Sequence, residues 1–498
     1  MKNMIRCLSA ALVLLMCLAS CGNQTSNTPS TTEAPKADAE TTTAAETEET
    51  HIPSVLPQDY DLDGYVMTYY GAKQEPDKNN SENGVYAAEQ NGDIINDAAY
   101  ARDSKVMEQY NFVIKFVECS GSHPNDSVKS VILAGDHAYD VILEGAGYMP
   151  ALAAEGMLVN MEDLEYMSLG SPWWLQTVND TLRIGGRLYS TIGSHMIRTK
   201  TFLYTVMFNY TIADDFGIEK EPLYEAARSG RWTLDMLYDN AKKVKADLNG
   251  DGNYDYNDLW GMSGESYCAY AMSYSAGVDF VKYDSKDVPH VSVNTEKNMD
   301  VITKVLTMMT DPEIMLVTNR ITGVSDIWKT RTDMLVSDKY MFFLGQPGPA
   351  AVRTMESDYG ILPAPKYDET QENYRHTTTI YNGTTMMIPV SAADPEKVGF
   401  IQEAVCYEAY YSFLPAFYQN FLETKYARNQ ESIEMLQIIH NSIYYDMGGI
   451  LAYDKMARVI TDIAGAGTGV DTITSKLSAN EESANQLIEK TISQILEH

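Results

Sequence analysis

The chain has 498 residues, of which 44% are hydrophobic and 21% are charged, and its formal net charge at pH 7 is −32. This length and composition are typical of a globular protein with two or more domains. Such a negative surface repels phosphate groups, so we expect no nucleic acid partner and take the acidity to keep the protein soluble.

The first 21 residues have the composition of a secretion signal. Lys2 and Arg6 precede an apolar run of about 11 residues, which is too short to span a bilayer. The end of the run, Leu18-Ala19-Ser20-Cys21, resembles the lipobox of bacterial lipoproteins. This resemblance implies that residues 1–20 are a removed signal peptide and that Cys21 carries acyl chains such as palmitate, which together anchor stably. We predict an extracytoplasmic protein held on the cell membrane by an N-terminal lipid; an ordinary signal with a chance cysteine is the alternative.

The segment after the signal is expected to be unstructured. Residues 21–54 are rich in Thr, Ser, Ala and Glu and have no apolar periodicity. Such a segment cannot bury enough apolar surface to offset its ordering entropy, so we predict a disordered tether. No later apolar run reaches the ~20 residues of a membrane helix.

Three cysteines follow the tether. Cys119, Cys268 and Cys406 are widely spaced and form no CxxC pair. We predict buried free thiols, with one disulfide as the alternative.

Strand and helix patterns alternate in the first part of the globular region. Runs of β-branched and aromatic residues predict strands, and this order indicates βαβ units and a largely parallel sheet. Ligands of such sheets bind beyond the carboxyl ends of the strands, where Tyr70 and Glu144 stand. The predicted elements are strands at 65–70, 112–117 and 139–143 and helices at 95–110 and 128–134.

A second α/β region is predicted to start near Gly193. Thr233 is placed to cap a helix, and Asp394 followed by Pro395 begins another. From Glu431 onward the sequence is predicted to be helical. Strands are expected at 202–208, 259–262 and 386–390, and helical apolar stripes at Leu234, Leu237, Ala241 and Val244 and at Ile488, Ile492 and Ile495.

An acidic loop follows the helix that Thr233 caps. Numbered from Asp247, oxygen-bearing side chains fall at positions 1, 3, 5, 9 and 12, and Gly252 at position 6 permits the tight turn of a calcium loop. Position 12 is Asp rather than the longer Glu of an EF-hand, so modest affinity is expected. We predict a structural Ca²⁺ site, with a metal-free turn as the alternative. Its ligands would be Asp247, Asn249, Asp251, Asn253 (through its backbone), Asp255 and Asp258.

Catalytic signatures are missing from the sequence. It has no GxSxG, HExxH, GxxxxGK[ST] or GxGxxG motif. The pair Asp214-Asp215 could serve glycoside hydrolysis, but adjacent acids arise by chance among 69 Asp and Glu. The eight histidines are scattered, so a zinc or manganese site is not expected either. We predict a protein that is not an enzyme, without catalytic residues or an organic cofactor.

Tyrosine and tryptophan are unusually frequent among the aromatic residues, with 34 Tyr and 5 Trp against 12 Phe. Both side chains combine a flat apolar face with a polar tip, which suits a sugar ring. Trp173-Trp174, Trp328 and Tyr267 lie in or beside predicted loops. Core packing is the alternative for each of them.

Several short segments also stand in a familiar order. They are Tyr139–Ile142 with Leu152–Asn160, Gly186–Tyr189, Arg231–Gly252, Tyr359–Pro365, and Met387–Pro389 with the helix at Asp394. In this order the segments resemble extracellular solute-binding proteins of family 1, the binding components of carbohydrate ABC importers. One departure is the hinge proline, which is replaced by Thr191-Ile192.

The resemblance implies an α/β fold of the two-lobed periplasmic-binding-protein-like class, type II-like, with a hinge and a ligand cleft between the lobes. One lobe would comprise 55–190 and 380–425, and the other 191–379 and 426–498. We expect a monomer that captures a sugar or oligosaccharide and delivers it to the membrane permease of an ABC importer. The expected ligand contacts, chosen by position, are Tyr70, Glu144 and Trp174 from the first lobe, Glu265, Tyr267, Trp328 and Gln346 from the second, and His195 just past the hinge.

Two other functions stay open at this point. The protein could be a surface enzyme that cleaves glycosides, although the missing catalytic signature disfavours it. It could also share the fold but present its ligand to a membrane receptor kinase.

Overall fold

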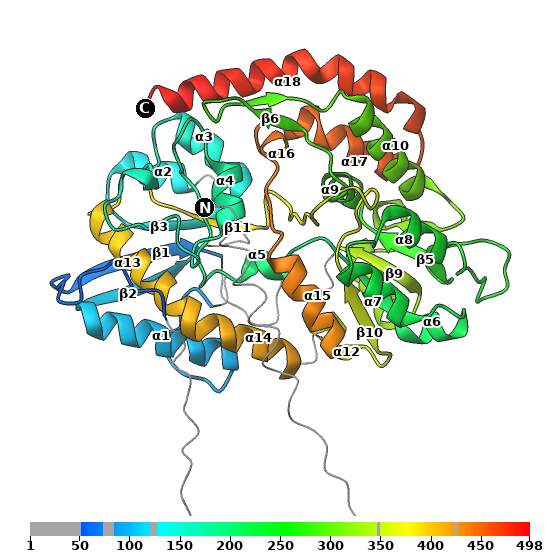
Figure 1. Ribbon diagram of the computed structural model, residues 1–498, viewed down its shortest axis with the longest axis horizontal. Coiled ribbons are helices and arrows are strands. Elements are labelled where there is room, and N and C mark those ends of the chain that lie inside the picture. The colour runs from blue at the N-terminus through cyan, green and yellow to red at the C-terminus, as the bar shows by residue number, and fades with distance from the viewer. Residues whose placement is uncertain (1–50, 73–83, 120–126, 346–348, 424–426) are drawn as a thin grey trace, which may run out of the picture. The chain divides into compact units, whose positions relative to one another are not determined.

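Two β-sheets organise the globular part of the chain (Figure 1). The structure is a computed structural model that describes residues 51–72, 84–119, 127–345, 349–423 and 427–498. Both sheets belong to the unit at 53–498. The signal peptide, Cys21, most of the expected tether and Gln346 lie outside the described residues.

The first sheet has four strands in the order β11-β3-β1-β2, and we call it, with its helices, lobe 1. β1 runs parallel to both β2 and β3, whereas β11 returns from far along the chain and pairs antiparallel with β3. The strands are β1 Tyr65–Gly71, β2 Phe112–Glu118, β3 Val141–Gly145 and β11 Thr384–Met387. The helices are α1 Ile94–Tyr110, α2 Ser127–Ala134, α3 Met149–Ala154, α4 Gln176–Leu182, α13 Pro395–Glu408 and α14 Leu414–Glu423.

The second sheet has five strands in the order β10-β4-β9-β5-β8, and we call this part lobe 2. β5 is parallel to β8 and β9, and β4 is antiparallel to β9 and β10. The strands are β4 Thr205–Asn209, β5 Trp260–Gly264, β8 Met315–Val317, β9 Tyr340–Gly345 and β10 Tyr359–Leu362, with a separate hairpin of β6 Val281–Tyr283 and β7 Pro289–Val291. The helices are α5 Arg198–Thr201, α6 Tyr210–Asp215, α7 Lys220–Arg228, α8 Leu234–Ala241, α9 Tyr267–Ser275, α10 Glu296–Thr310, α11 Ile327–Val336, α12 Pro349–Thr354, α15 Gln430–His440, α16 Met447–Leu451, α17 Ala457–Ala466 and α18 Ile473–Leu496.

The predicted helix caps are confirmed. The Thr233 hydroxyl accepts a hydrogen bond from the backbone N–H of Met236, which satisfies a free donor of the first turn of α8. Asp394 caps α13 in the same way through Lys397, and Pro395 occupies a position that needs no donor.

Three strands begin two or more residues away from their predicted starts, and β5 begins one residue late. β3 begins two residues later than expected because Asp140 closes the preceding turn, where its carboxylate accepts the backbone N–H of Thr68. β4 begins only at Thr205, since Phe202 closes the last turn of α5 through its N–H to Thr199 at 3.2 Å and Tyr204 pairs with Thr377 instead of with the sheet. β11 ends at Met387 because Pro389 has no N–H to donate to a ladder.

Two chain segments connect the lobes and lie side by side. Residues 190–204 lead out of lobe 1, and residues 376–384 lead back into it. Thr191 and Met386 exchange two backbone hydrogen bonds of 3.2 and 2.9 Å, and the backbone N–H of Tyr204 donates to Thr377 at 3.0 Å. The paired segments form the hinge that the resemblance implied.

The C-terminal helix α18, which follows α17 of lobe 2, also contacts lobe 1 (Figure 1). Its first half packs on α17 and β7, and its end lies beside α3 of lobe 1. There Arg187 donates to the carbonyl of Ile495 at 2.8 Å. A helix of 24 residues is about 36 Å long, and so extends beyond the lobe in which it starts.

The remaining predictions on the core hold within the described residues. Cys119, Cys268 and Cys406 are buried thiols. The stripe of Ile488, Ile492 and Ile495 is buried on α18. None of the helices that the structure describes is both long and apolar enough to cross a membrane.

Candidate functional site

The parallel strands of each lobe end at a common edge, which is where open α/β sheets place their ligands. At these edges the chain leaves the sheet, so the side chains just after each strand are not covered by a neighbouring strand. The carboxyl ends are Gly71, Glu118 and Gly145 in lobe 1 and Gly264, Val317 and Gly345 in lobe 2.

Five tyrosines connect these two edges in a continuous series of ring contacts, which we call the tyrosine row. Tyr148 follows β3, Tyr381 lies on the hinge segment, Tyr453 follows α16, and Tyr267 and Tyr204 lie at the edge of the lobe 2 sheet. Taken in this order, successive ring centroids are 5.9, 6.0, 6.3 and 5.3 Å apart. The first two contacts are edge-to-face and the last two are stacked, which are favourable aromatic geometries.

The row is most exposed at Tyr381 and becomes more buried from there towards lobe 2. Tyr381 is 41% exposed, whereas Tyr267 is 8% and Tyr204 3% exposed. Tyr148 and Tyr453 are half-buried. The accessible faces are therefore those nearest the hinge, where a ring-shaped ligand could stack.

Polar groups accompany these rings. The Tyr204 hydroxyl donates to Glu265 Oε1 at 2.6 Å. The buried Tyr267 hydroxyl lies near the Ile380 backbone without reaching hydrogen-bond geometry, and has no partner among the described residues. Burial raises the pKa of Tyr204 and of Tyr267 well above the ordinary value, so both remain protonated donors at neutral pH.

Close backbone contacts hold the hinge segment against the end of β3. A Cβ atom on Gly145 would lie 2.5 Å from the carbonyl oxygen of Tyr381 and 2.6 Å from that of Ile380. Gly147 donates its N–H to Ile380 at 2.9 Å. Only glycine fits at position 145, and this contact fixes Tyr381 between the two lobes.

Two of the expected ligand contacts, Glu265 and Tyr267, meet in the tyrosine row. Glu144 lies at the carboxyl end of β3 but is buried, and its side chain accepts the N–H of Gly145 at 2.8 Å. Tyr70 stacks on Tyr139 at 4.1 Å and its hydroxyl lies 2.9 Å from Ser127 Oγ, so its ring is engaged within lobe 1.

Trp174 and His195 are buried, contrary to the exposed positions that direct ligand contact requires. Trp174 is 1% exposed and its indole N–H donates to Glu403 at 2.8 Å. His195 is fully buried with Nδ1 3.3 Å from Cys406 Sγ, and burial lowers its pKa well below the ordinary value. Contacts with α13 bury both side chains: Glu403 holds Trp174, and Cys406 lies against His195.

The remaining expected contact in the described part of lobe 2 is Trp328. It lies in the first turn of α11 and is 44% exposed. Gln346 falls outside the described residues.

The sequence analysis missed Tyr148, Tyr204, Tyr381 and Tyr453. Tyr148 could have been found, because it follows the predicted strand at 139–143 on the ligand-facing side. Tyr204 lay inside the predicted strand at 202–208, and only the observed start of β4 at Thr205 places it at the strand end. Tyr381 and Tyr453 carry no local signal, since the hinge and the α16 segment bring them together from 72 positions apart in the numbering.

The predicted calcium loop is closed by its own side chains. Asp247 accepts the N–H groups of Gly250 and Gly252 at 2.7 and 2.9 Å, and the buried Asp258 accepts those of Leu248 and Asp255, both at 2.9 Å. No group of three or more His, Cys, Asp or Glu residues in the described ranges is arranged to hold a metal ion. Calcium binding by this loop stays a prediction.

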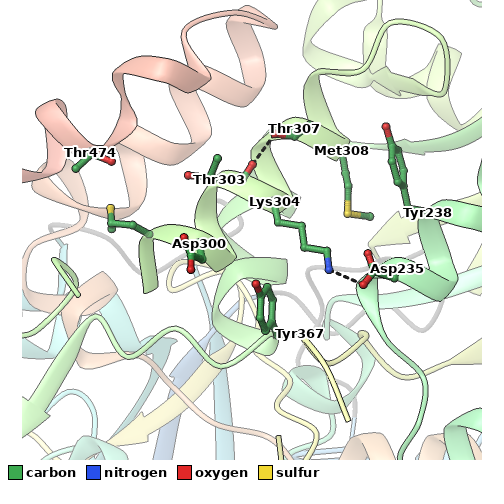
Figure 2. A pocket seen from close by; sticks show the side chains of 10 residues that line it. Asp235, Tyr238, Asp300, Thr303, Lys304, Thr307, Met308, Tyr367 and Thr474 are labelled. Carbon is green, nitrogen blue, oxygen red and sulfur yellow. Dashed lines mark hydrogen bonds and ion pairs between the residues drawn. The ribbon is translucent and has the colours of Figure 1, made fainter. Parts of the chain in front are cut away.

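A surface pocket of about 510 Å³ lies elsewhere, on helices of lobe 2 (Figure 2). Its walls come mainly from α8 and α10, and the Lys304 ammonium is paired with Asp235 at 2.7 Å. The same ammonium lies 4.9 Å from the centroid of the Tyr367 ring. The pocket has no residue at a strand end, and its one lysine is already paired, so we favour the tyrosine row as the ligand site.

Comparison with known proteins identifies the fold. No family profile matches the sequence, and no curated protein matches it. Among solved structures, a cyclo/maltodextrin-binding protein complexed with maltotetraose has a TM-score of 0.56 at 10% identity, covering 84% of this chain and 96% of that one. The GacH receptor of Streptomyces glaucescens, solved unliganded and with acarbose, has a TM-score of 0.54 at 13% identity, covering 86% and 99%. An ABC substrate-binding protein from Listeria monocytogenes in complex with cycloalternan has a TM-score of 0.51 at 13% identity, covering 85% and 99%.

These matches extend over nearly the whole of each solved chain. The chain therefore has the two-lobed α/β fold of the solute-binding proteins of carbohydrate ABC transporters, and the predicted fold class is confirmed.

Proposed function

We propose that this protein captures a sugar or oligosaccharide between its two lobes and delivers it to the permease of an ABC importer. The observation that carries the proposal is the tyrosine row, which places aromatic faces and phenol donors at the strand ends of both lobes. A sugar ring offers an apolar face for stacking and hydroxyls for hydrogen bonds. Three solved proteins of the same fold were crystallised with oligosaccharides or an oligosaccharide mimic, which supports the ligand class.

Within this proposal, Tyr148, Tyr381 and Tyr453 provide the accessible faces. Glu265, which is half-buried, provides the carboxylate that fixes the orientation of the ligand, and the buried Tyr267 ring stacks on Tyr453 and supports it. These groups suit recognition without covalent chemistry, so we do not propose that the protein is an enzyme.

Isothermal titration of the detergent-solubilised full chain against a panel of oligosaccharides tests the ligand class. Replacing an aromatic face that stacks on the ligand costs about 0.5–1.5 kcal/mol, so Tyr381→Ala should weaken binding roughly threefold to tenfold. Tyr254→Ala is the matched control, because Tyr254 is 39% exposed but lies on the acidic loop. Binding to a peptide or polyamine with no response to any saccharide would refute the ligand class.

We also propose that Cys21 carries the lipid anchor and that residues 21–54 tether the globular part to the membrane. A tether keeps the binding protein near its permease, which raises the local concentration of captured ligand. Metabolic labelling with an alkyne analogue of palmitate should mark the wild-type chain but not Cys21→Ser. Equal labelling of both chains would contradict the anchor.

A further inference from the structure

Helix α11 begins at the same edge of lobe 2 as the tyrosine row. The helix connects β8 to β9, and the two strands run in the same direction because β5 pairs parallel with both. The Met334 thioether contacts the hydroxyl of Tyr340, at the start of β9, whereas Arg331 lies over Phe343, near its end. Helix and strand are therefore antiparallel, and the first turn of α11 lies at the carboxyl edge of the sheet.

Arg331 occupies this end of α11 with its charge held by aromatic rings. Its guanidinium carbon lies 5.0 Å from the centroid of the Trp328 ring and 5.5 Å from that of Phe343. Trp328 is 44% exposed and Arg331 is half-buried. Such contacts orient a guanidinium without using its N–H groups.

No hydrogen bond or ion pair to the Arg331 guanidinium is found among the described residues. Lys329, on the same helix, differs from Arg331 in this respect, because its ammonium is paired with both oxygens of Asp333 at 2.8 and 2.6 Å. Arg331 thus presents planar donors at the strand ends in a chain whose net charge is −32.

Arg331 lies near the polar end of the tyrosine row. A Cβ atom on Gly345 would lie 3.7 Å from the Phe343 ring, over which Arg331 lies, and 4.0 Å from the Cys268 thiol. The backbone N–H of Cys268 in turn donates to the carbonyl of Glu265 at 3.0 Å. The loop after β8 reaches the same place, since Asn319 accepts the backbone N–H of Ser266 at 2.8 Å. The edge of lobe 2 is therefore continuous from Trp328 and Arg331 to Glu265 and Tyr267.

We propose that Trp328 and Arg331 form a subsite for a sugar unit that bears an oxyanion, a carboxylate or a sulfate ester, within the saccharide that the proposed function assigns to this protein. Trp328 would stack on the ring, and the guanidinium fork would bind the two oxygens of the anion together. The acidic surface repels such a ligand at long range. The selectivity of the subsite must therefore come from direct contact.

Titration with matched saccharides tests the subsite. The probes are oligosaccharides of galacturonate, glucuronate and mannuronate, each paired with the carboxyl-reduced neutral form, and a sulfated galactose oligosaccharide. The wild-type chain should bind at least one charged probe tenfold or more tighter than its neutral form. Arg331→Ala should remove that preference, and Arg331→Lys should restore only part of it, because an ammonium has no planar fork.

Lys329→Ala is the control for the charge of α11, and it should leave the preference within twofold of wild type. Thermal melting of each variant checks that the fold is intact. A stronger response to the sulfated probe than to the uronates would assign the anion as sulfate. Tighter binding of neutral forms, or a charge preference that survives in Arg331→Ala, would overturn the subsite while leaving saccharide capture in place. Silence across all saccharides would instead refute the proposed function.

Discussion

Glu403 illustrates how single residues decide the role of their neighbours. This carboxylate on α13 accepts the indole N–H groups of Trp173 and Trp174 at 2.9 and 2.8 Å and the backbone N–H of Ser168 at 3.0 Å. Burial raises its pKa, and the three donors oppose that rise. Two tryptophans that have the chemistry of a sugar platform are thereby held in the core of lobe 1.

Glu403→Gln should destabilise the protein by about 1–3 kcal/mol, because the amide has one acceptor oxygen and leaves one buried indole N–H without a partner. Glu408→Gln, on the same helix, removes only the ion pair with Lys105, whose side chain is 61% exposed, and should cost less than about 1 kcal/mol. Urea unfolding followed by tryptophan fluorescence measures both. Equal losses would show that Glu403 does not hold the two indoles.

Helix α18 has a structural role that its sequence pattern did not predict. Helix α18 was predicted from its apolar stripe, and the structure adds that its end packs on lobe 1 beside Arg187. The helix and the hinge segments both connect the lobes. Any change in the angle between the lobes must therefore either separate the end of α18 from lobe 1 or bend the helix.

The buried stripe of α18 should account for most of its contribution to stability. Ile488→Ala should cost about 2–5 kcal/mol, because Ile488 is 1% exposed and its removal leaves a cavity. Leu487→Ala is the matched control one position away, at 39% exposure, and should stay within about 0.5 kcal/mol of wild type. Similar costs at the two positions would contradict the orientation of the helix.

The acidic loop at 247–258 provides a second test at this scale. If the loop binds calcium, Asp251→Ala should lower the melting temperature in calcium but not in excess chelator. The physical reason is that the metal-bound state would use the Asp251 carboxylate as a ligand, whereas without metal it accepts only exposed hydrogen bonds from Asn253 and Asn249, whose loss costs little. The same loss in chelator would identify the loop as a metal-free turn closed by Asp247 and Asp258.

At the scale of the whole molecule, buried histidines lie where the lobes meet. His376 on the hinge segment accepts the N–H of Ala364 at 2.9 Å and contacts Ser442 Oγ at 2.8 Å, and His440 contacts the carbonyl of Lys200 at 3.2 Å. Burial lowers the pKa of both to about 3, so they are neutral in the folded protein. His195 is neutral for the same reason.

These histidines should make the fold sensitive to acid. A folded pKa of about 3 lies below the unfolded value of 6.5, so the unfolded chain binds more protons and stability falls as the pH drops from about 6.5 towards 3. Each histidine contributes up to about 1.4 kcal/mol per pH unit in that window. The buried Asp103 and Asp446 act in the opposite sense, because burial raises the pKa of each to about 6 and they favour folding as they protonate.

The variant His376→Gln tests the contribution of one histidine to this pH dependence of stability. The variant should be less stable than wild type at pH 7, where it loses a buried hydrogen bond, and the difference should shrink between pH 6.5 and 4. Melting temperatures across that range measure it. A difference that stays constant with pH would show that His376 does not titrate on unfolding.

Local chemistry explains which elements could be predicted. The caps at Thr233 and Asp394 and the stripe on α18 depend on neighbours within four residues, so the sequence specified them. β3, β4 and β11 were displaced because Asp140, α5 and Pro389 act through contacts or geometry that a strand pattern does not contain. The abundance of side chains suited to sugar binding was also predictable. Of the expected contacts in the described chain, however, only Tyr267 belongs to the tyrosine row and only Glu265 is hydrogen-bonded to it, through Tyr204.

The sequence by itself determined the alternation of strands and helices and the abundance of tyrosine, because these follow from periodicity and composition along the chain. Its short motifs also carried the resemblance that implied the two-lobed fold. Only the tertiary structure decided which tyrosines meet. Tyr148, Tyr381 and Tyr453 come from three separate segments, and the hinge brings them together with Tyr267 through backbone contacts such as those of Gly145. The same folding buried Trp174 and left Arg331 between two rings at the strand ends. Burial depends on residues distant in sequence, and one sequence alone does not contain that information.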